Sequence, residues 1–166
     1  IGLVTEDRKD QGMLPLMNVA DNMLVSNYRP VQKGPFISQK KTAATCTGFI
    51  RDLDIRTSGF RQFVRNLSGG NQQKVILARW LNTNVNLLIF DEPTRGIDVA
   101  AKQQIHELMR ALARSGKSIL MISSELPEIL AMSDRILVMH EGRLRGELAT
   151  GEATEEKILH LATGGE

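Results

Sequence analysis

The sequence has few of the residue types on which several kinds of site depend. Its 166 residues include a single cysteine, Cys46, and three scattered histidines, which excludes an internal disulfide and argues against a transition-metal site. Aromatic residues make up only 4% of the chain, and no Lys/Arg block is interleaved with them, so we expect no nucleic-acid partner. Cys46 is expected to be a small buried residue on a helix.

Long hydrophobic runs are also missing. Although hydrophobic residues form 42% of the chain, no run approaches the roughly 20 apolar residues that a membrane-spanning helix needs. The length suits one domain with one core and a possible small second lobe. The composition is typical of a soluble, intracellular domain. Because Ile1 is not preceded by an initiator methionine, we expect the sequence to begin inside a longer protein.

The most informative stretch begins with two glycines at the start of a predicted helix. Ser68, Gly69 and Gly70 precede a helical run from Asn71 to about Leu81. Glycines let the backbone come close to a ligand, and a helix N-terminus presents free N–H groups with a partial positive charge. The segment therefore predicts an anion site, although alone it would more often be a loop with an N-cap serine.

Two carboxylates follow a predicted strand in the same stretch. The run from Val85 to Phe90 is apolar and has the length of a buried parallel strand. Asp91 and Glu92 should therefore lie at its carboxyl end, where α/β sheets bind their ligands. Two carboxylates at this edge suit Mg²⁺ and a water molecule, although alone the pair would more often be a solvated strand end.

Together these segments resemble the ABC-type ATPase cassette. Residues 67–71, Leu-Ser-Gly-Gly-Asn, are similar to the signature motif, and 87–94 to the Walker B strand with its adjoining glutamate. Residues 96–98 resemble the D-loop. The fifth signature residue is usually glutamine and here is Asn71, a shorter amide with the same hydrogen-bonding groups. The segments NQQKVILARWL, DEPTRGIDV and ISSELPE resemble the second cassette of the tandem ATPases that power bacterial uptake of ribose, galactose, xylose and related sugars.

The resemblance implies a fold and an activity. The fold would be α/β, a partial ABC-ATPase cassette with a helical lobe, and the activity an ATPase coupled to transport. Two cassettes would enclose ATP, so that the signature motif of one faces the P-loop of the other. ATP and Mg²⁺ are the implied cofactors. The resemblance implies four roles for site residues. ATP held by the partner cassette would be bound by Ser68, Gly69, Gly70 and Asn71. Asp91 would bind Mg²⁺, Glu92 would act as general base, and Asp98 would link the two sites.

The resemblance also implies partners and a location. Besides a partner cassette, these would be a transmembrane permease and, indirectly, a sugar-binding protein. The chain would then lie at the cytoplasmic face of the bacterial inner membrane as a peripheral component. Which sugar is carried does not follow from the sequence.

Two positions depart from the pattern that most cassettes share. A glutamine usually stands where this chain has Glu6, and touches Mg²⁺ and the attacking water. A histidine that contacts the γ-phosphate usually stands where this chain has Ser124. A serine hydroxyl can bond a phosphate but cannot carry positive charge. Glu6 and Ser124 remain candidate nucleotide-site residues, but they leave open whether this cassette hydrolyses ATP.

The sequence contains no P-loop. Gly116-Lys117-Ser118 resembles the end of one, but the pattern requires a glycine five residues earlier, where Ala111 stands. These residues also end a predicted helix and open a strand, the reverse of the P-loop order, so we interpret them as a helix C-cap and turn. The resemblance places the phosphate cradle upstream of Ile1, and the isolated chain is expected to be inactive.

The remaining patterns predict the elements around these motifs. We expect a core strand and polar loop in residues 1–13, a helical lobe in 14–66, and the signature motif with the α/β core in 67–166. Asp98 is a good N-cap for a helix with an apolar face that includes Ile105 and Met109. Other elements are expected as helices at 18–25 and 38–53, a loop at 28–36, a strand at 119–122, a hairpin around 140–143 and a closing helix at 154–162.

Two other functions stay open at this stage. One is a non-catalytic dimerisation or regulatory half-cassette, which Glu6, Ser124 and the absent P-loop would favour. The other is an ABC-type ATPase of DNA repair or translation, which shares the signature motif and Walker B strand. The missing coiled-coil heptads and the segments that resemble the sugar-import cassette argue against this second function.

Overall fold

The computed structural model describes residues 1–165, without the side chain of Lys9, and divides the chain into two compact units. The first unit comprises Ile1–Ile122 and the second begins at Ser123. The boundaries expected at residues 13 and 66 both fall inside the first unit and stay predictions. In the described part of the chain, no helix has the length and apolar character needed to cross a membrane.

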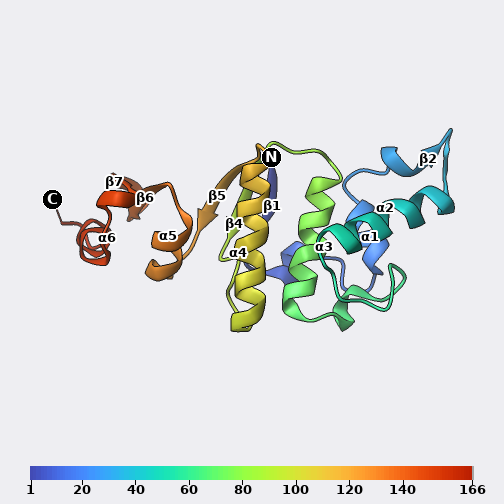
Figure 1. Ribbon diagram of the computed structural model, residues 1–166, viewed down its shortest axis with the longest axis horizontal. Helices are drawn as coiled ribbons and strands as arrows, with labels where there is room; N and C mark the ends of the chain where they lie inside the picture. The colour runs from blue at the N-terminus through green and yellow to red at the C-terminus, as the bar shows by residue number, and fades with distance from the viewer. Residues whose placement is uncertain (166) are drawn as a thin grey trace. The chain divides into compact units, whose positions relative to one another are not determined.

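The first unit contains a parallel three-stranded sheet, with α3 (Gly69–Leu81) and the helical lobe to one side of it (Figure 1). Its strands are β1 (Gly2–Val4), β4 (Leu87–Asp91) and β5 (Ser118–Ile122), in the order β1-β4-β5. Val4 pairs with Phe90, and Phe90 pairs with Met121. Because all three strands are parallel, their carboxyl ends meet at one edge. The residues that follow β1 and β4 are therefore neighbours.

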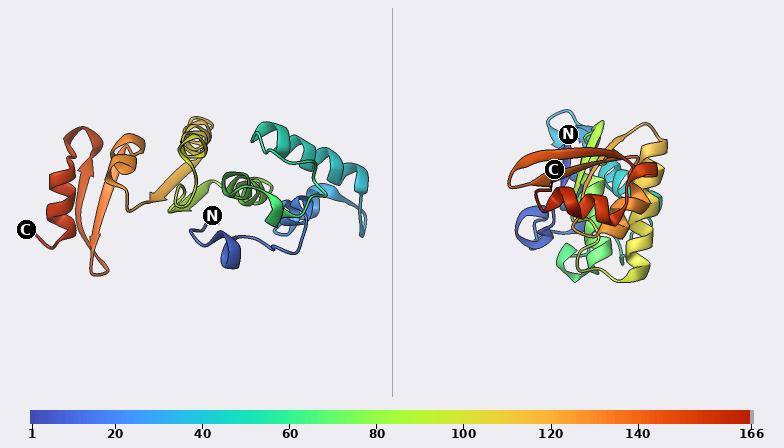
Figure 2. Two further views of the ribbon diagram at one scale, coloured as in Figure 1. Left: turned by 90° about the horizontal axis from the view of Figure 1, so that it is seen from below. Right: turned by 90° about the vertical axis from the view of Figure 1, so that its left-hand side faces the viewer.

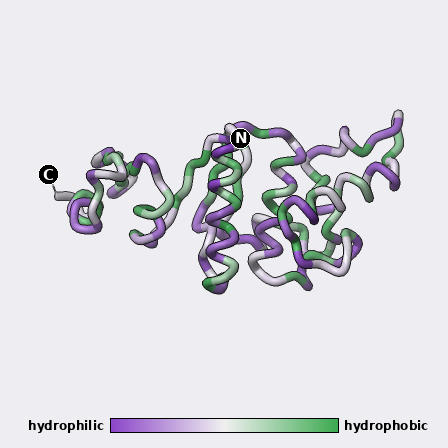
Figure 3. Tube along the Cα trace, viewed as in Figure 1, coloured by the Kyte–Doolittle hydropathy of each residue, from purple (hydrophilic) through white to green (hydrophobic). Residues whose placement is uncertain are grey.

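Two long helices pack against the sheet. Helix α3 (Gly69–Leu81) contacts β1, and α4 (Val99–Arg114) contacts β5 and α3. The two helices lie side by side with nearly parallel axes (Figures 1 and 2). Along α4, hydrophobic and hydrophilic residues alternate in bands (Figure 3), because Ile105 and Met109 are buried, as predicted, while the opposite side is polar. The shared core includes Val4, Val75, Ile76, Leu77, Leu88, Phe90, Ile105 and Met109.

The opposite face of the sheet carries exposed apolar side chains. Leu3 and Leu120 lie on one row of the register, through Ile89 between them, and are 47% and 43% exposed. Ile122 on the same side of β5 is 48% exposed. Parallel sheets are ordinarily covered on both faces. This face is therefore a surface suited to packing against further protein.

The helical lobe consists of two α-helices and several short elements. Helices α1 (Val19–Leu24) and α2 (Gln39–Asp52) confirm the two predicted helices, and Cys46 on α2 is fully buried. The expected plain loops are wrong in detail. The loop at 28–36 contains a 3₁₀ turn and a small hairpin, and the polar loop after β1 winds into a π-helical turn. These elements are η2 (Arg29–Val31), β2 (Gln32–Lys33), β3 (Phe36–Ile37), η1 (Arg8–Gly12) and, later, η3 (Val64–Asn66).

Buried polar side chains fix α3 to its neighbours. Lys74 is 5% exposed, and its ammonium donates to the Asp54 carbonyl at 2.8 Å and to Gln104 Oε1 on α4 at 3.1 Å. Arg79 donates to the carbonyl and the side chain of Asn22 on α1 at 2.9 and 3.1 Å. Breaking such a bond would leave a buried polar group without its partner, which costs about 1–3 kcal/mol. The lobe and α4 therefore hold α3 in a defined place.

The second unit is a hairpin packed by two helices. Strands β6 (Arg135–His140) and β7 (Arg143–Ala149) are joined by Glu141 and Gly142, which both have positive φ, as a two-residue hairpin turn requires. Helix α5 (Leu126–Met132), the turn η4 (Thr150–Glu152) and helix α6 (Glu155–Ala162) complete the unit. Its core centres on Ile136, Val138 and Ile158. The predicted hairpin and closing helix are confirmed.

Candidate functional site

The start of α3 has the geometry of an anion site. Ser68 occupies the N-cap position with extended backbone, but its side chain makes no capping hydrogen bond. The first-turn N–H groups of any helix have no acceptor within that helix, and the helix dipole adds partial positive charge there. Ser68 is therefore the N-cap residue by position, but its side chain leaves the first-turn N–H groups uncapped. The terminus can receive an anion.

Asn71 is tied into the protein. Its side-chain amide donates to Ser68 Oγ at 2.8 Å, and its amide oxygen accepts from the backbone N–H of Arg56, also at 2.8 Å. Asn71 therefore orients the serine hydroxyl and connects it to the end of the helical lobe. In this conformation, the asparagine that replaces the usual glutamine therefore makes its hydrogen bonds within the chain.

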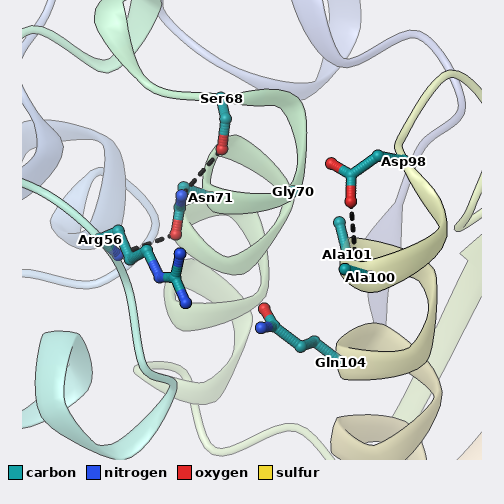
Figure 4. Close-up of a pocket in the computed structure, with 8 residues that line it drawn as sticks. All are labelled: Arg56, Ser68, Gly70, Asn71, Asp98, Ala100, Ala101 and Gln104. Carbon is teal, nitrogen blue, oxygen red and sulfur yellow. Dashed lines mark hydrogen bonds between the residues drawn. The ribbon is translucent and has the colours of Figure 1, made fainter.

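A hollow of about 170 Å³ lies between the start of α3 and the start of α4. Asp98, Ala101 and Gln104 face Ser68, Gly70 and Asn71 across it (Figure 4). Asp98 is the N-cap of α4 and accepts from the Ala101 N–H at 2.9 Å. Arg56 also lines the hollow and adds a positive charge. The structure therefore brings the signature segment and Asp98, which are 30 residues apart in the sequence, into one site.

The two signature glycines permit close packing within the chain. A Cβ on Gly70 would stand 3.1 Å from Ala101 Cβ, and one on Gly69 would stand 3.3 Å from Ile97 Cγ2 and 3.5 Å from Arg8 Nη2. The two shorter distances are tighter than ordinary van der Waals contacts. The glycines therefore let α3 approach α4 and the turn before it. A bulky Gly69→Glu variant would disturb this packing, so it cannot test ligand contact cleanly.

Asp91 and Glu92 lie at the carboxyl end of β4, as predicted. Asp91 is half-buried and pairs with Ile122. The Glu92 N–H donates to the Ile122 carbonyl at 2.9 Å, which extends the sheet contact past the strand end. Glu92 has φ +46, in the left-handed region that favours glycine. A non-glycine residue held there costs of the order of 1–3 kcal/mol, and such residues are concentrated at functional sites.

Glu6 follows β1 at the same sheet edge and forms an ion pair with Arg95. Arg95 lies in the turn after β4, and its guanidinium donates to the Glu6 carboxylate. Both side chains are largely exposed, at 42% for Glu6 and 66% for Arg95. A glutamine at position 6 could not form this ion pair. The carboxylate that stands at position 6 in place of the usual glutamine therefore has a cationic partner, Arg95, in the adjacent turn.

Ser124 belongs to the second unit and is described there. It is exposed and follows Ser123, whose hydroxyl donates to Glu128 at 2.6 Å and accepts from the Glu125 N–H at 3.0 Å. These bonds stabilise the entry into α5, which has Pro127 in its first turn. The role expected for Ser124 stays a prediction.

The carboxylates at the sheet edge fit a nucleotide-bound Mg²⁺. Among residues 1–165, no group of three or more His, Cys, Asp or Glu side chains is arranged to hold a metal ion. Mg²⁺ is commonly bound through one or two carboxylates together with the phosphates of a substrate. Asp91, half-buried at the strand end, suits that mode of binding.

Three arginines at this site have no motif that would single them out in the sequence. Arg8 and Arg95 stand in charged loops that are equally consistent with a solvated surface, and Arg56 lies 12 residues before Ser68 without any local pattern. Only the folded chain places Arg8 and Arg56 beside the start of α3 and joins Arg95 to the loop after β1.

The chain is similar to curated proteins that are described as sugar-import ATP-binding proteins. The chain is 52% identical over 165 residues to a putative ribose/galactose/methyl galactoside import ATP-binding protein of Rhizobium etli, covering 99% of this chain and 32% of that protein. A protein of the same description from Geobacillus kaustophilus is 49% identical over 164 residues, covering 99% and 33%. The chain thus spans about a third of the length of these relatives.

Solved structures share the fold. A dimeric ATP-binding cassette in a post-hydrolysis state, bound to ADP and Pi, superimposes with a TM-score of 0.72 at 19% identity, covering 90% of this chain and 62% of that one. This likeness confirms the α/β cassette fold. The family described as ABC transporter matches residues 1–95, which is more than half of the chain. The chain therefore belongs to the ABC transporter family.

Proposed function

We propose that the chain is the signature-bearing part of an ATP-binding subunit that powers sugar import. The hollow between α3 and α4 carries this proposal, because it joins an uncapped helix start, Arg56 and Asp98 in one place. A positively polarised helix terminus with flanking glycines suits a phosphate. Asp91 and Glu92 lie in the same unit, at the edge of the sheet.

The relatives support the sugar and the import direction. Proteins described as ribose/galactose/methyl galactoside import ATP-binding proteins match almost the whole chain at about half identity. These descriptions favour import over DNA repair or translation. We extend the proposal to a permease partner, an indirect sugar-binding protein and a peripheral place at the membrane. The exposed apolar sheet face is consistent with a role next to further protein.

Each site residue has a distinct role in the proposed reaction. Ser68 and the first-turn N–H groups of α3 bind the γ-phosphate of ATP that a partner cassette holds. Asp98 lies beside them and connects this contact to the turn that follows β4. Glu92 accepts a proton from the attacking water as general base. Asp91 would hold Mg²⁺, which would supply charge neutralisation for the phosphates when bound.

The test is Glu92→Gln in a full-length subunit that contains these residues, purified with its permease. We expect turnover to fall by roughly 10²–10⁴-fold, since the amide cannot accept the proton, while ATP binding survives. Glu141→Gln is a matched control, because Glu141 also has a left-handed φ, +47, but lies in the hairpin turn of the second unit. The control should keep full turnover.

The same experiment decides whether the site is catalytic or regulatory. If Glu92→Gln and the wild type hydrolyse ATP equally fast, the site on this chain is not the catalytic one, and the regulatory half-cassette becomes the better account. If both variants lose activity equally, the loss belongs to the backbone strain or to folding and not to the base. Sugar uptake in vesicles, measured with the same variants, then reports whether hydrolysis is coupled to transport.

A further inference from the structure

Two arginines join the loop after β1 to the turn after β4 in a reciprocal way. Arg8 in the first segment donates through Nη2 to the carbonyl of Arg95 in the second, at 3.3 Å. Arg95 donates through its own guanidinium to the carboxylate of Glu6 in the first segment. Each segment thus supplies an arginine to the other. Arg8 also donates through Nη1 to Gln73 Oε1 on α3, at 3.2 Å.

The chain provides space for the Arg8 guanidinium. A Cβ on Gly69 would lie 3.5 Å from Arg8 Nη2, and a Cβ on Gly96 would lie 3.6 Å from the same atom. Gly96 has φ +69, a conformation that glycine adopts at no steric cost. The guanidinium therefore fits between the first signature glycine and the turn that leads to Asp98. Larger residues at either position would crowd it.

The charge of Arg8 is badly placed for a residue that only packs. A cation beside a helix N-terminus opposes the helix dipole. Burial also lowers the pKa of Arg8, since desolvation disfavours its charged form. An uncharged side chain of the same length would fill the space without either cost. A positive charge here does, however, favour an anion at the start of α3.

We propose that Arg8 is a positioning residue of the candidate site. Its fork holds three segments at fixed spacing: the loop with Glu6, the first turns of α3, and the turn that leads to Asp98. Arg95 closes the same junction by binding Glu6, so the helix terminus and Asp98 are presented together. This inference deepens the proposed function and rests on it for its effect on ATP turnover.

Two kinds of measurement test this role. The first is amide hydrogen exchange in the 166-residue chain, which needs no nucleotide. Arg8→Gln should raise exchange at both residues 69–73 and 95–98, and Arg8→Lys should do so less, because an ammonium cannot span two acceptors as a guanidinium fork does. Arg114→Gln, an exposed arginine at the end of α4, is the control and should change neither segment.

The second measurement is ATP turnover in the full-length subunit with its permease. Arg8→Gln should lower kcat roughly tenfold while KM for ATP changes less than about threefold, the pattern of lost transition-state positioning. Arg8→Lys should recover part of kcat. If Arg8 acted only in folding, its replacement would lower the amount of active subunit. Turnover is therefore compared at equal amounts of folded protein, as measured by circular dichroism, where a role in folding alone would not yield this graded recovery.

The outcomes separate this inference from the function on which it rests. If exchange stays unchanged in both segments, Arg8 does not position them and the inference is overturned, whatever the turnover. If exchange rises in both segments while even the wild-type subunit hydrolyses no ATP, the positioning stands and the proposed function fails. If Arg8→Gln does not fold, Arg8→Lys decides, and wild-type exchange and kcat in that variant would overturn the inference.

Discussion

The packing of Gly70 against Ala101 leads to a prediction that can be developed quantitatively. A Cβ on Gly70 would lie 3.1 Å from Ala101 Cβ, so α3 or α4 must shift by a few tenths of an ångström to accept Gly70→Ala. Overpacking of this kind costs about 1–3 kcal/mol. Replacing glycine by alanine in a helix returns roughly 0.5–1 kcal/mol. We therefore expect Gly70→Ala to lower the free energy of unfolding by about 1 kcal/mol.

The reciprocal change should relieve the crowding. Ala101→Gly alone costs about 1 kcal/mol of helix propensity, because it leaves no contact in exchange. In the double variant Gly70→Ala/Ala101→Gly the methyl group has moved from one helix to the other, and the space is again filled once. The double variant should therefore be more stable, by about 1–2 kcal/mol, than the sum of the two single effects.

Urea denaturation measures these free energies directly. The chain has one tryptophan, Trp80, which lies on α3 and donates to the Leu3 carbonyl at 2.7 Å, so its fluorescence reports on this helix. If the two single effects are simply additive, the close approach of α3 and α4 is not what requires glycine at position 70, and the packing argument is wrong.

ATP turnover in the full-length subunit extends the same cycle to function. Gly70 lines the hollow, so the methyl group that Gly70→Ala adds toward α4 would also narrow the anion site, and the double variant should fold normally but hydrolyse ATP more slowly than the wild type. A double variant that folds normally but hydrolyses no ATP would mean that Gly70 is needed for contact with the nucleotide itself.

The remaining predictions concern Cys46 and the isolated chain. Burial, with a smaller effect of Asp21, raises the pKa of the Cys46 thiol from 9.0 to about 11. The neutral thiol therefore stabilises the fold fully below pH 9. This stabilisation is lost between pH 9 and 11, by about 2–3 kcal/mol in total. Urea denaturation at several pH values should show this fall in the wild type and a smaller one in Cys46→Ala, and parallel curves would contradict it. Because residues 1–166 contain no P-loop pattern, calorimetry should detect only weak ATP binding to this chain alone, and tight binding would show that another cradle exists.

Local patterns in the sequence were sufficient for most of the elements. Helix α4 is predicted by the N-cap residue Asp98 and the spacing of Ile105 and Met109. The hairpin of the second unit is predicted by its short turn, in which only Glu141 and Gly142 separate the two strands. In each case the information lies within a few residues, because capping, periodicity and turn chemistry are local effects. The same effects failed at residues 28–36, where short elements form without a periodic pattern.

Local sequence patterns specify the chemical groups of the site: a glycine-flanked helix start, two carboxylates after a strand, and an aspartate that caps the next helix. Which of these groups share a site depends on the three-dimensional packing of the chain. The hollow between α3 and α4 and the reciprocal arginine bonds between the loop after β1 and the turn after β4 depend on contacts between residues far apart in the chain, up to 89 positions for Glu6 and Arg95. The physical reason is that parallel strands align their carboxyl ends at one edge whatever their separation in the chain, and side chains such as Arg8 then meet partners that no local pattern specifies.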